Sequence, residues 1–151
     1  MNFIINLKPE IMMNDEVRTI MEKNPRTTSS NKNVGELSVE MLNEGIQQLP
    51  VVDDGKLVGL ITVHDLWRHY ENKASIADMN VSDVMNTNIL RISPIDKIGT
   101  AAELFADKRF KTIPVVNKEN HLKGVITAFD IIKVTFKNEY SAPILYRDAF
   151  S

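Results

Sequence analysis

Residues Leu49 to Asp65 read LPVVDDGKLVGLITVHD, and residues Ile113 to Asp130 read IPVVNKENHLKGVITAFD. Both stretches follow one pattern: an apolar run with an early proline, a polar turn, a second apolar run and then Thr-x-x-Asp. Self-similarity of this kind is typical of a repeat architecture, in which each copy packs against its neighbour. We therefore expect two similar halves within one compact chain.

The similarity continues upstream of these stretches. Val17 and Met21 match Val81 and Met85 at an offset of 64 positions. The second copy then has one extra residue in its turn, NKENH against DDGK, and the offset becomes 65. Because length is tolerated in surface loops, an insertion at this point supports a true duplication.

Local patterns predict the elements of each half. Apolar residues at helical spacing predict the first helix of each half. A proline is tolerated at the first residue of a strand, and DDGK predicts a hairpin with Gly55 at positive φ. The helices predicted in this way cover residues 34–42, 63–71, 98–105 and 128–137, and the strands of the two hairpins begin near Pro50, Lys56, Pro114 and His121.

The segments ahead of the first helices differ between the halves. Residues 88–94 (NILRISP) predict a strand, whereas residues 25–30 (PRTTSS) are polar and predict a weaker one. This difference predicts a looser first half.

Composition excludes several classes of protein. The chain has 151 residues, a net charge of −2 and no cysteine, so disulfides and thiol catalysis are excluded. The balance of charge gives no reason to expect a nucleic-acid partner. No apolar run approaches the roughly 20 residues of a membrane span, and we read no signal peptide at the start. A cytoplasmic protein without a membrane partner is the expectation.

At these residues the chain strongly resembles the CBS domain family, named after cystathionine β-synthase. The matching stretches are PVVDDGKLVGLITVHDL and PVVNKENHLKGVITAFDI, each preceded by an amphipathic helix and by VxxIM or VxxVM. The resemblance implies an α+β fold of two CBS repeats, each β-α-β-β-α, packed sheet to sheet with pseudo-two-fold symmetry. It also implies a homodimer, disc-like in shape, that binds adenosyl ligands in clefts between the halves.

The repeat sets the expected domain organisation. The boundaries are an N-terminal extension at 1–16, CBS repeat 1 at 17–73, a linker at 74–80, CBS repeat 2 at 81–138 and a C-terminal tail at 139–151. The tail is too apolar for a solvated segment, so we expect it to pack on the body or on a neighbouring chain.

The two Thr-x-x-Asp motifs are the sharpest candidates for a ligand site. A carboxylate can accept hydrogen bonds from both ribose hydroxyls, and a threonine at a helix N-terminus can help to hold phosphate. The family resemblance implies these roles for Asp65 and Asp130 and for Thr62 and Thr127. The alternative is a capping box, with threonine as N-cap and aspartate reaching back to its N–H.

Other candidates come from the segments that the family uses around its ligand. Arg91 could meet phosphate, or be a solvated strand residue. Ile46 with Leu49, or Phe110 with Ile113, could form an adenine wall, or simple core. The preferred second-half site contains Arg91, Ser93, Lys111, Thr112, Ile113, Thr127 and Asp130. The first-half site contains Thr27, Thr28, Ile46, Gln48, Thr62, His64 and Asp65, with Arg68 as a further candidate.

The function predicted is a regulatory CBS module that senses AMP, ADP or ATP, ranked ahead of S-adenosylmethionine, and modulates an unidentified partner protein. No nucleophile–base group or paired-carboxylate motif stands out, so we do not expect an enzyme. The three histidines do not converge in sequence, and we expect no metal site. The alternative function is a protein-interaction or dimerisation module whose ligand sites are degenerate.

Overall fold

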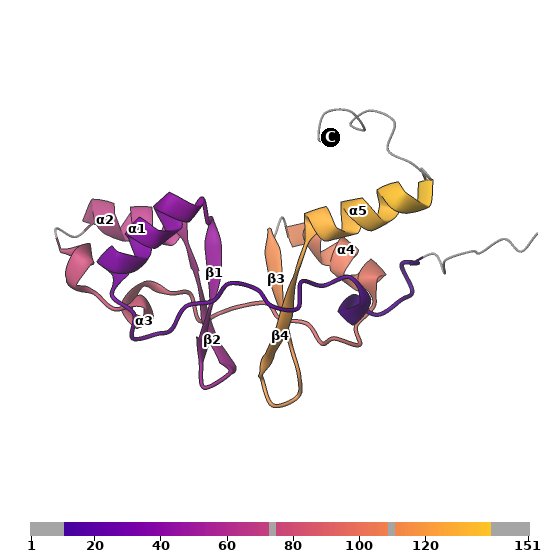
Figure 1. Cartoon of the computed structure of the whole chain (residues 1–151), viewed down its shortest axis with the longest axis horizontal. Coiled ribbons are helices and arrows are strands. Elements are labelled where there is room, and N and C mark those ends of the chain that lie inside the picture. The colour runs from indigo at the N-terminus through magenta and orange to yellow at the C-terminus, as the bar shows by residue number, and fades with distance from the viewer. Residues whose placement is uncertain (1–10, 73–74, 109–110, 140–151) are drawn as a thin grey trace, which may run out of the picture.

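The computed structural model describes residues 11–72, 75–108 and 111–139 and shows a mixed helix and strand fold with two antiparallel hairpins. The hairpins lie side by side at the centre, and helices cover the outer flank of each (Figure 1). The elements are η1 (Val17–Thr19), α1 (Val34–Glu44), β1 (Gln48–Asp53), β2 (Lys56–Thr62), α2 (Val63–Asn72), η2 (Ile76–Asp78), α3 (Val81–Val84), α4 (Ile98–Lys108), β3 (Thr112–Val116), β4 (Leu122–Thr127) and α5 (Ala128–Glu139).

The predicted helices and hairpins are confirmed, and local chemistry explains their ends. Helix α1 begins after Asn33, whose side chain accepts a hydrogen bond from the Glu36 N–H, and it ends at Gly45 with φ of 67°. A left-handed glycine is a common helix stop because it has no Cβ to clash. The first hairpin turns through Asp54 and Gly55 at φ of 51° and 79°, as a tight turn between strands requires.

The strand predicted at residues 88–94 is wrong, and so is the predicted difference between the halves. Each leading segment makes a single parallel bridge, Thr28 to Val51 in the first half and Ile92 to Val115 in the second. Pro94 has no N–H with which to extend the ladder, and the chain turns there instead.

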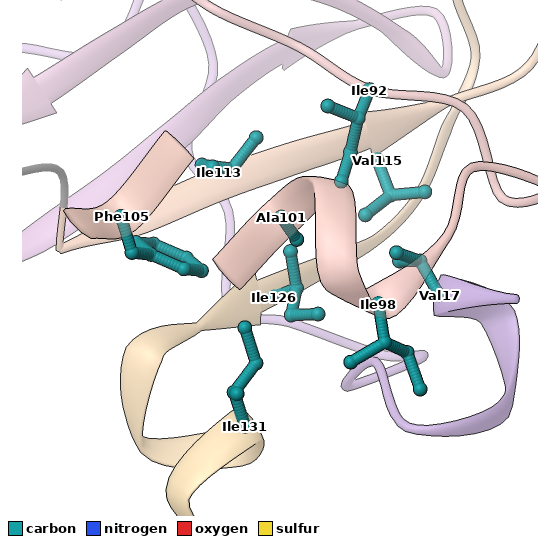
Figure 2. Packing of buried hydrophobic residues seen from close by; sticks show 9 residues of the cluster. All are labelled: Val17, Ile92, Ile98, Ala101, Phe105, Ile113, Val115, Ile126 and Ile131. Carbon is teal, nitrogen blue, oxygen red and sulfur yellow. The ribbon is translucent and has the colours of Figure 1, made fainter. Parts of the chain in front are cut away.

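Two hydrophobic clusters form the core, and they do not follow the sequence repeats. Val17, from the start of the first repeat, packs with Ile98 and Ile126 of the second half (Figure 2). Val81, from the start of the second repeat, packs with α1 and β1 of the first half. The indigo segment of Figure 1 accordingly begins beside α4 and crosses the hairpins to reach α1. The two halves therefore exchange their leading segments.

Each exchanged segment also pairs with a strand of the hairpin on which it packs. Glu22 and Val125 exchange backbone hydrogen bonds of 2.9 and 3.0 Å, and Leu60 and Asn86 exchange two of 2.9 Å. Gly124 allows the segment around Glu22 to lie close to β4, because a Cβ built at Gly124 would lie 2.5 Å from the Glu22 carbonyl oxygen. The strand positions facing the crossing segments therefore require glycine.

The hairpins contact each other at their turns. The Leu57 N–H donates to the Asn120 carbonyl at 3.0 Å, and the Leu122 N–H donates to the Gly55 carbonyl at 3.0 Å. Asn120 Nδ2 adds a bond of 2.8 Å to the Leu57 carbonyl. Asn120 lies in the longer second turn, so the insertion supplies a contact between the halves. Among the described residues, no helix is long and apolar enough to cross a membrane.

Candidate functional site

The Thr-x-x-Asp motifs form reciprocal capping boxes at the starts of α2 and α5. Asp65 Oδ2 accepts from the Thr62 N–H at 3.0 Å, and Thr62 Oγ1 accepts from the Asp65 N–H at 3.0 Å. Asp130 Oδ2 and Thr127 Oγ1 make the same pair of bonds, at 2.8 and 3.1 Å. The capping interpretation therefore holds in both halves, and any ligand role is additional to it.

The first-half aspartate has both carboxylate oxygens engaged. Thr62 Oγ1 donates a further bond of 2.8 Å to Asp65 Oδ2, and Arg68 Nη2 donates one of 2.7 Å to Asp65 Oδ1. Asp65 is only 8% exposed and is the one buried charged residue in the described part of the chain. The sequence proposed Arg68 as a ligand contact; its spacing of three residues on a helix also indicates this pairing with Asp65.

The second-half aspartate is less occupied. Across the described ranges, no hydrogen bond or ion pair reaches Asp130 Oδ1. The residue that corresponds to Arg68 is Lys133, whose Nζ lies 5.1 Å from the centroid of the Phe129 ring. Asp130 is also more exposed than Asp65. One oxygen of this carboxylate is thus open to a donor from outside the chain.

The two motifs lie at the same end of their hairpins, away from the turns. Thr62 is the cross-strand partner of Gln48, and Thr127 is the cross-strand partner of Thr112. Gln48 Nε2 donates to Thr112 Oγ1, so the two predicted sites adjoin through this contact between the halves. His64, which follows Thr62 closely on α2, is exposed.

Arg91 does not join the group around Thr127 and Asp130. Its guanidinium donates to Asn120 Oδ1 at 2.5 Å, in the turn at the opposite end of β4 from Thr127. At about 3.3 Å per residue, that strand separates the two ends by roughly 16 Å. Ser93 lies on the same leading segment, and its N–H is bound to Asp96 Oδ2 at 2.7 Å. The structure therefore does not bring Arg91 together with Thr127 and Asp130, and their joint action on one ligand stays a prediction.

The remaining candidates, which lead into β1 and β3, divide between core and surface. Ile113 is fully buried in the cluster that contains Val17, which favours the core alternative for its side chain. Ile46 is partly buried against the cluster that contains Val81. Lys111 is exposed at the start of β3, where it leads into Thr112. Phe110, the other predicted adenine contact, lies outside the described residues.

The first-half leading segment is better held than its sequence suggests. Thr27 is exposed, and Thr28 is bonded through its backbone to both neighbours of Val51. Two residues on, Ser30 donates its hydroxyl to Asp53 Oδ2 at 2.5 Å and its N–H to Asp53 Oδ1 at 3.1 Å. The hydroxyl bond, followed by the backbone bond, lowers the pKa of Asp53 below its usual value. Polar residues such as Ser30 therefore hold this segment against the first hairpin through hydrogen bonds.

Metal ligands do not gather in the part of the chain that the structure describes. It contains no group of three or more histidine, aspartate or glutamate side chains with the geometry to hold an ion. The polar groups that the structure does bring together are hydrogen-bonding groups at helix starts, suited to hydroxyl and phosphate oxygens.

Comparison with known proteins identifies the family. The sequence model of the CBS domain matches residues 17–66 and 81–137. An uncharacterized protein of Methanocaldococcus jannaschii is 34% identical over 99 residues, which are 65% of this chain and 24% of that protein. The chain therefore spans about a quarter of the length of this relative.

Solved structures share the fold, and two of them were determined in complex with a ligand. The CBS domain pair of protein MJ0100, in complex with 5′-methylthioadenosine and S-adenosyl-L-methionine, is 26% identical with a TM-score of 0.67, covering 83% of this chain and 98% of that one. The cytosolic domain of the Mg²⁺ channel MgtE, in complex with ATP, is 25% identical with a TM-score of 0.68, covering 80% of this chain and 48% of that one. With its two matched segments and this shared architecture, the chain belongs to the CBS domain family, as a tandem pair.

Proposed function

We propose that this chain is a regulatory module that binds an adenosine nucleotide, AMP, ADP or ATP, and modulates a partner protein. The observation that carries the proposal is the open oxygen of Asp130, held at the start of α5 beside Thr127. The ligands of the related structures, ATP and S-adenosyl compounds, share an adenosine group and support this class of ligand.

In this proposal Asp130 accepts hydrogen bonds from the ribose hydroxyls. Thr127 and the N-terminal N–H groups of α5 face phosphate, where the helix dipole favours negative charge. Lys111, exposed one residue before Thr112, adds a positive charge within the same part of the fold. Gln48 places the first half beside this group through its bond to Thr112.

The regulatory step follows from that position between the halves. A ligand that binds more tightly to one arrangement of the halves shifts the population toward it by its difference in affinity. The Gln48–Thr112 bond links the halves directly beside Thr127, the cross-strand partner of Thr112, so we propose that the ligand acts on the geometry of this link.

Calorimetric titration with AMP, ADP, ATP and S-adenosylmethionine tests the proposal, together with thermal unfolding. One bound ligand at one hundred times its dissociation constant should add roughly 2.7 kcal/mol to the free energy of unfolding. The Asp130→Asn variant, which keeps the shape but removes the charge, should lose most of this gain. Absence of heat and of stabilisation with all four compounds at millimolar concentration would overturn the proposal.

A second candidate is a protein-interaction or dimerisation module, favoured by the exposed apolar side chains of α2 and α5. Trp67 and Tyr70 are 57% and 65% exposed and stack on each other at 6.3 Å between ring centroids. Phe129 and Ile132 on α5 are 63% and 57% exposed. Light scattering should give the mass of two chains for the natural protein and of one chain for Trp67→Ser. A single-chain mass for the natural protein would count against it.

A further inference from the structure

The two capping aspartates differ in what binds them, and the difference begins with two residue pairs in the sequence. Arg68 in the first half corresponds to Lys133 in the second, and His64 corresponds to Phe129, each at the offset of 65 positions. The Lys133 ammonium lies over the Phe129 ring, which is a favourable cation–π arrangement. In the first half the corresponding ring is the imidazole of His64, and Arg68 bonds to Asp65 instead.

The Arg68 guanidinium occupies the atom that a ligand would need. Asp65 Oδ2 already accepts from the N–H and the hydroxyl of Thr62, so Oδ1 is the remaining acceptor. Arg68 Nη2 binds that oxygen at 2.7 Å, and the Asp65 side chain is 11% exposed. Arg68 brings a positive charge to this carboxylate, whereas a ribose diol would bring only neutral hydroxyl donors to the same oxygen.

The second half keeps the same capping box without an arginine bound to its carboxylate. Asp130 Oδ2 accepts from the Thr127 N–H, and no described residue donates to Oδ1. Both threonines cap a helix that follows directly on a strand, and the first motif differs by the bond from the Thr62 hydroxyl to Asp65 Oδ2 and by the bond from Arg68. The identity of the residue three positions after the aspartate therefore separates an occupied carboxylate from an open one.

We propose that Arg68 is an internal plug that closes the first-half site, so that each chain binds one adenosine nucleotide, at Asp130. This inference rests on the proposed function of the chain as a nucleotide-binding module. It makes Arg68 the residue that determines the number of ligands bound, and it predicts that its removal creates a second site at Asp65.

Calorimetry with AMP as the probe measures the number of sites directly. The natural chain should bind one AMP, and Arg68→Ala should bind two. Lys133→Ala, at the corresponding position, is the matched control and should still bind one. Asp130→Asn should abolish binding in the natural background and leave one site in the Arg68→Ala background. Arg68 is 59% exposed at its side chain, so its truncation leaves the core intact, and Arg68→Gln provides a second variant of similar length.

The outcomes separate the inference from the function on which it rests. Two sites in the natural chain, or one site in both Arg68 variants, would overturn the plug and leave nucleotide binding in place. Weaker binding at the single site in both Arg68 variants would show that Arg68 is itself a ligand contact, which also overturns it. No binding of AMP, ATP or S-adenosylmethionine by the natural chain or by Arg68→Ala would overturn both.

Discussion

At the scale of single residues, Asp65 and Asp130 each cap the N-terminus of a helix, but their carboxylates accept different numbers of hydrogen bonds. Asp130 gives its helix one carboxylate bond, to the Thr127 N–H. Asp65 binds the N–H and hydroxyl of Thr62 and the guanidinium of Arg68. The same motif is thus mainly structural in the first half and partly open in the second.

This difference should be measurable in the free energy of unfolding without ligand. The free energy of unfolding of Asp130→Ala should be about 1 kcal/mol lower than that of the natural chain, the usual loss when a helix cap is removed. The free energy of unfolding of Asp65→Ala should fall by roughly 1 kcal/mol more, because this substitution also leaves Thr62 Oγ1 and Arg68 without their acceptor. The ion pair contributes little to this difference, because Arg68 is exposed. Urea unfolding of the two variants gives the comparison.

The exposed Glu103 on α4 offers a control, since Glu103→Ala should change stability by no more than about 0.5 kcal/mol. Equal losses for the two aspartates would contradict the assignment of extra bonds to Asp65.

At the scale of elements, each crossing segment lies close to a strand at a glycine, where no side chain keeps the two apart. A Cβ at Gly124 would lie 2.5 Å from the Glu22 carbonyl oxygen, which is backbone. A Cβ at Gly59 would meet Met85 instead, at 2.4 Å from Sδ and 2.9 Å from Cγ. The obstacle is rigid in one half and mostly a flexible side chain in the other.

The stability lost in the two glycine-to-alanine variants should therefore be recovered to different extents by a second substitution. Both Gly59→Ala and Gly124→Ala should destabilise by about 1–3 kcal/mol, as overpacking does. Met85→Ala should recover much of the loss in the Gly59→Ala background, whereas Met21→Ala should recover little in the Gly124→Ala background. Double-mutant cycles in urea measure the two coupling energies. Equal coupling in the two cycles would refute the distinction between backbone and side-chain obstacles.

At the scale of the whole molecule, the exchange of leading segments makes the two cores mutually dependent. Val17 is fully buried among residues of the second half, and Val81 is fully buried among residues of the first. Neither half is therefore complete without a segment from the other repeat, which favours a single folding unit.

Hydrogen exchange can locate the effect of each valine. Val17→Ala should cost about 2 kcal/mol through the cavity that it leaves, and it should reduce protection first in α4, β3 and β4. Val81→Ala, its counterpart, should reduce protection first in α1, β1 and β2. Loss of protection in the same half as the substituted repeat would show that the leading segments are not exchanged in solution.

Local chemistry along the chain was sufficient to predict several features of this protein. The duplication, the two hairpins, the four long helices and the two capping boxes follow from apolar spacing, turn glycines and Thr-x-x-Asp, which act within a few residues. The family also follows from these motifs, because they lie in register in both copies.

Other features depend on contacts between distant parts of the chain, and these could not be predicted from local patterns. Residues 88–94 have the composition of a strand, yet a single bridge and the turn at Pro94 leave no ladder for them to extend. The direction of the Arg91 side chain depends on Asn120, and the exchange of Val17 and Val81 depends on where the crossing segments run. Arg68 and Lys133 occupy matching positions, and they differ because a guanidinium meets a carboxylate in one half and an ammonium meets an aromatic ring in the other. Such outcomes are set by which groups the fold brings within a few ångströms, and local sequence patterns carry no record of those distances.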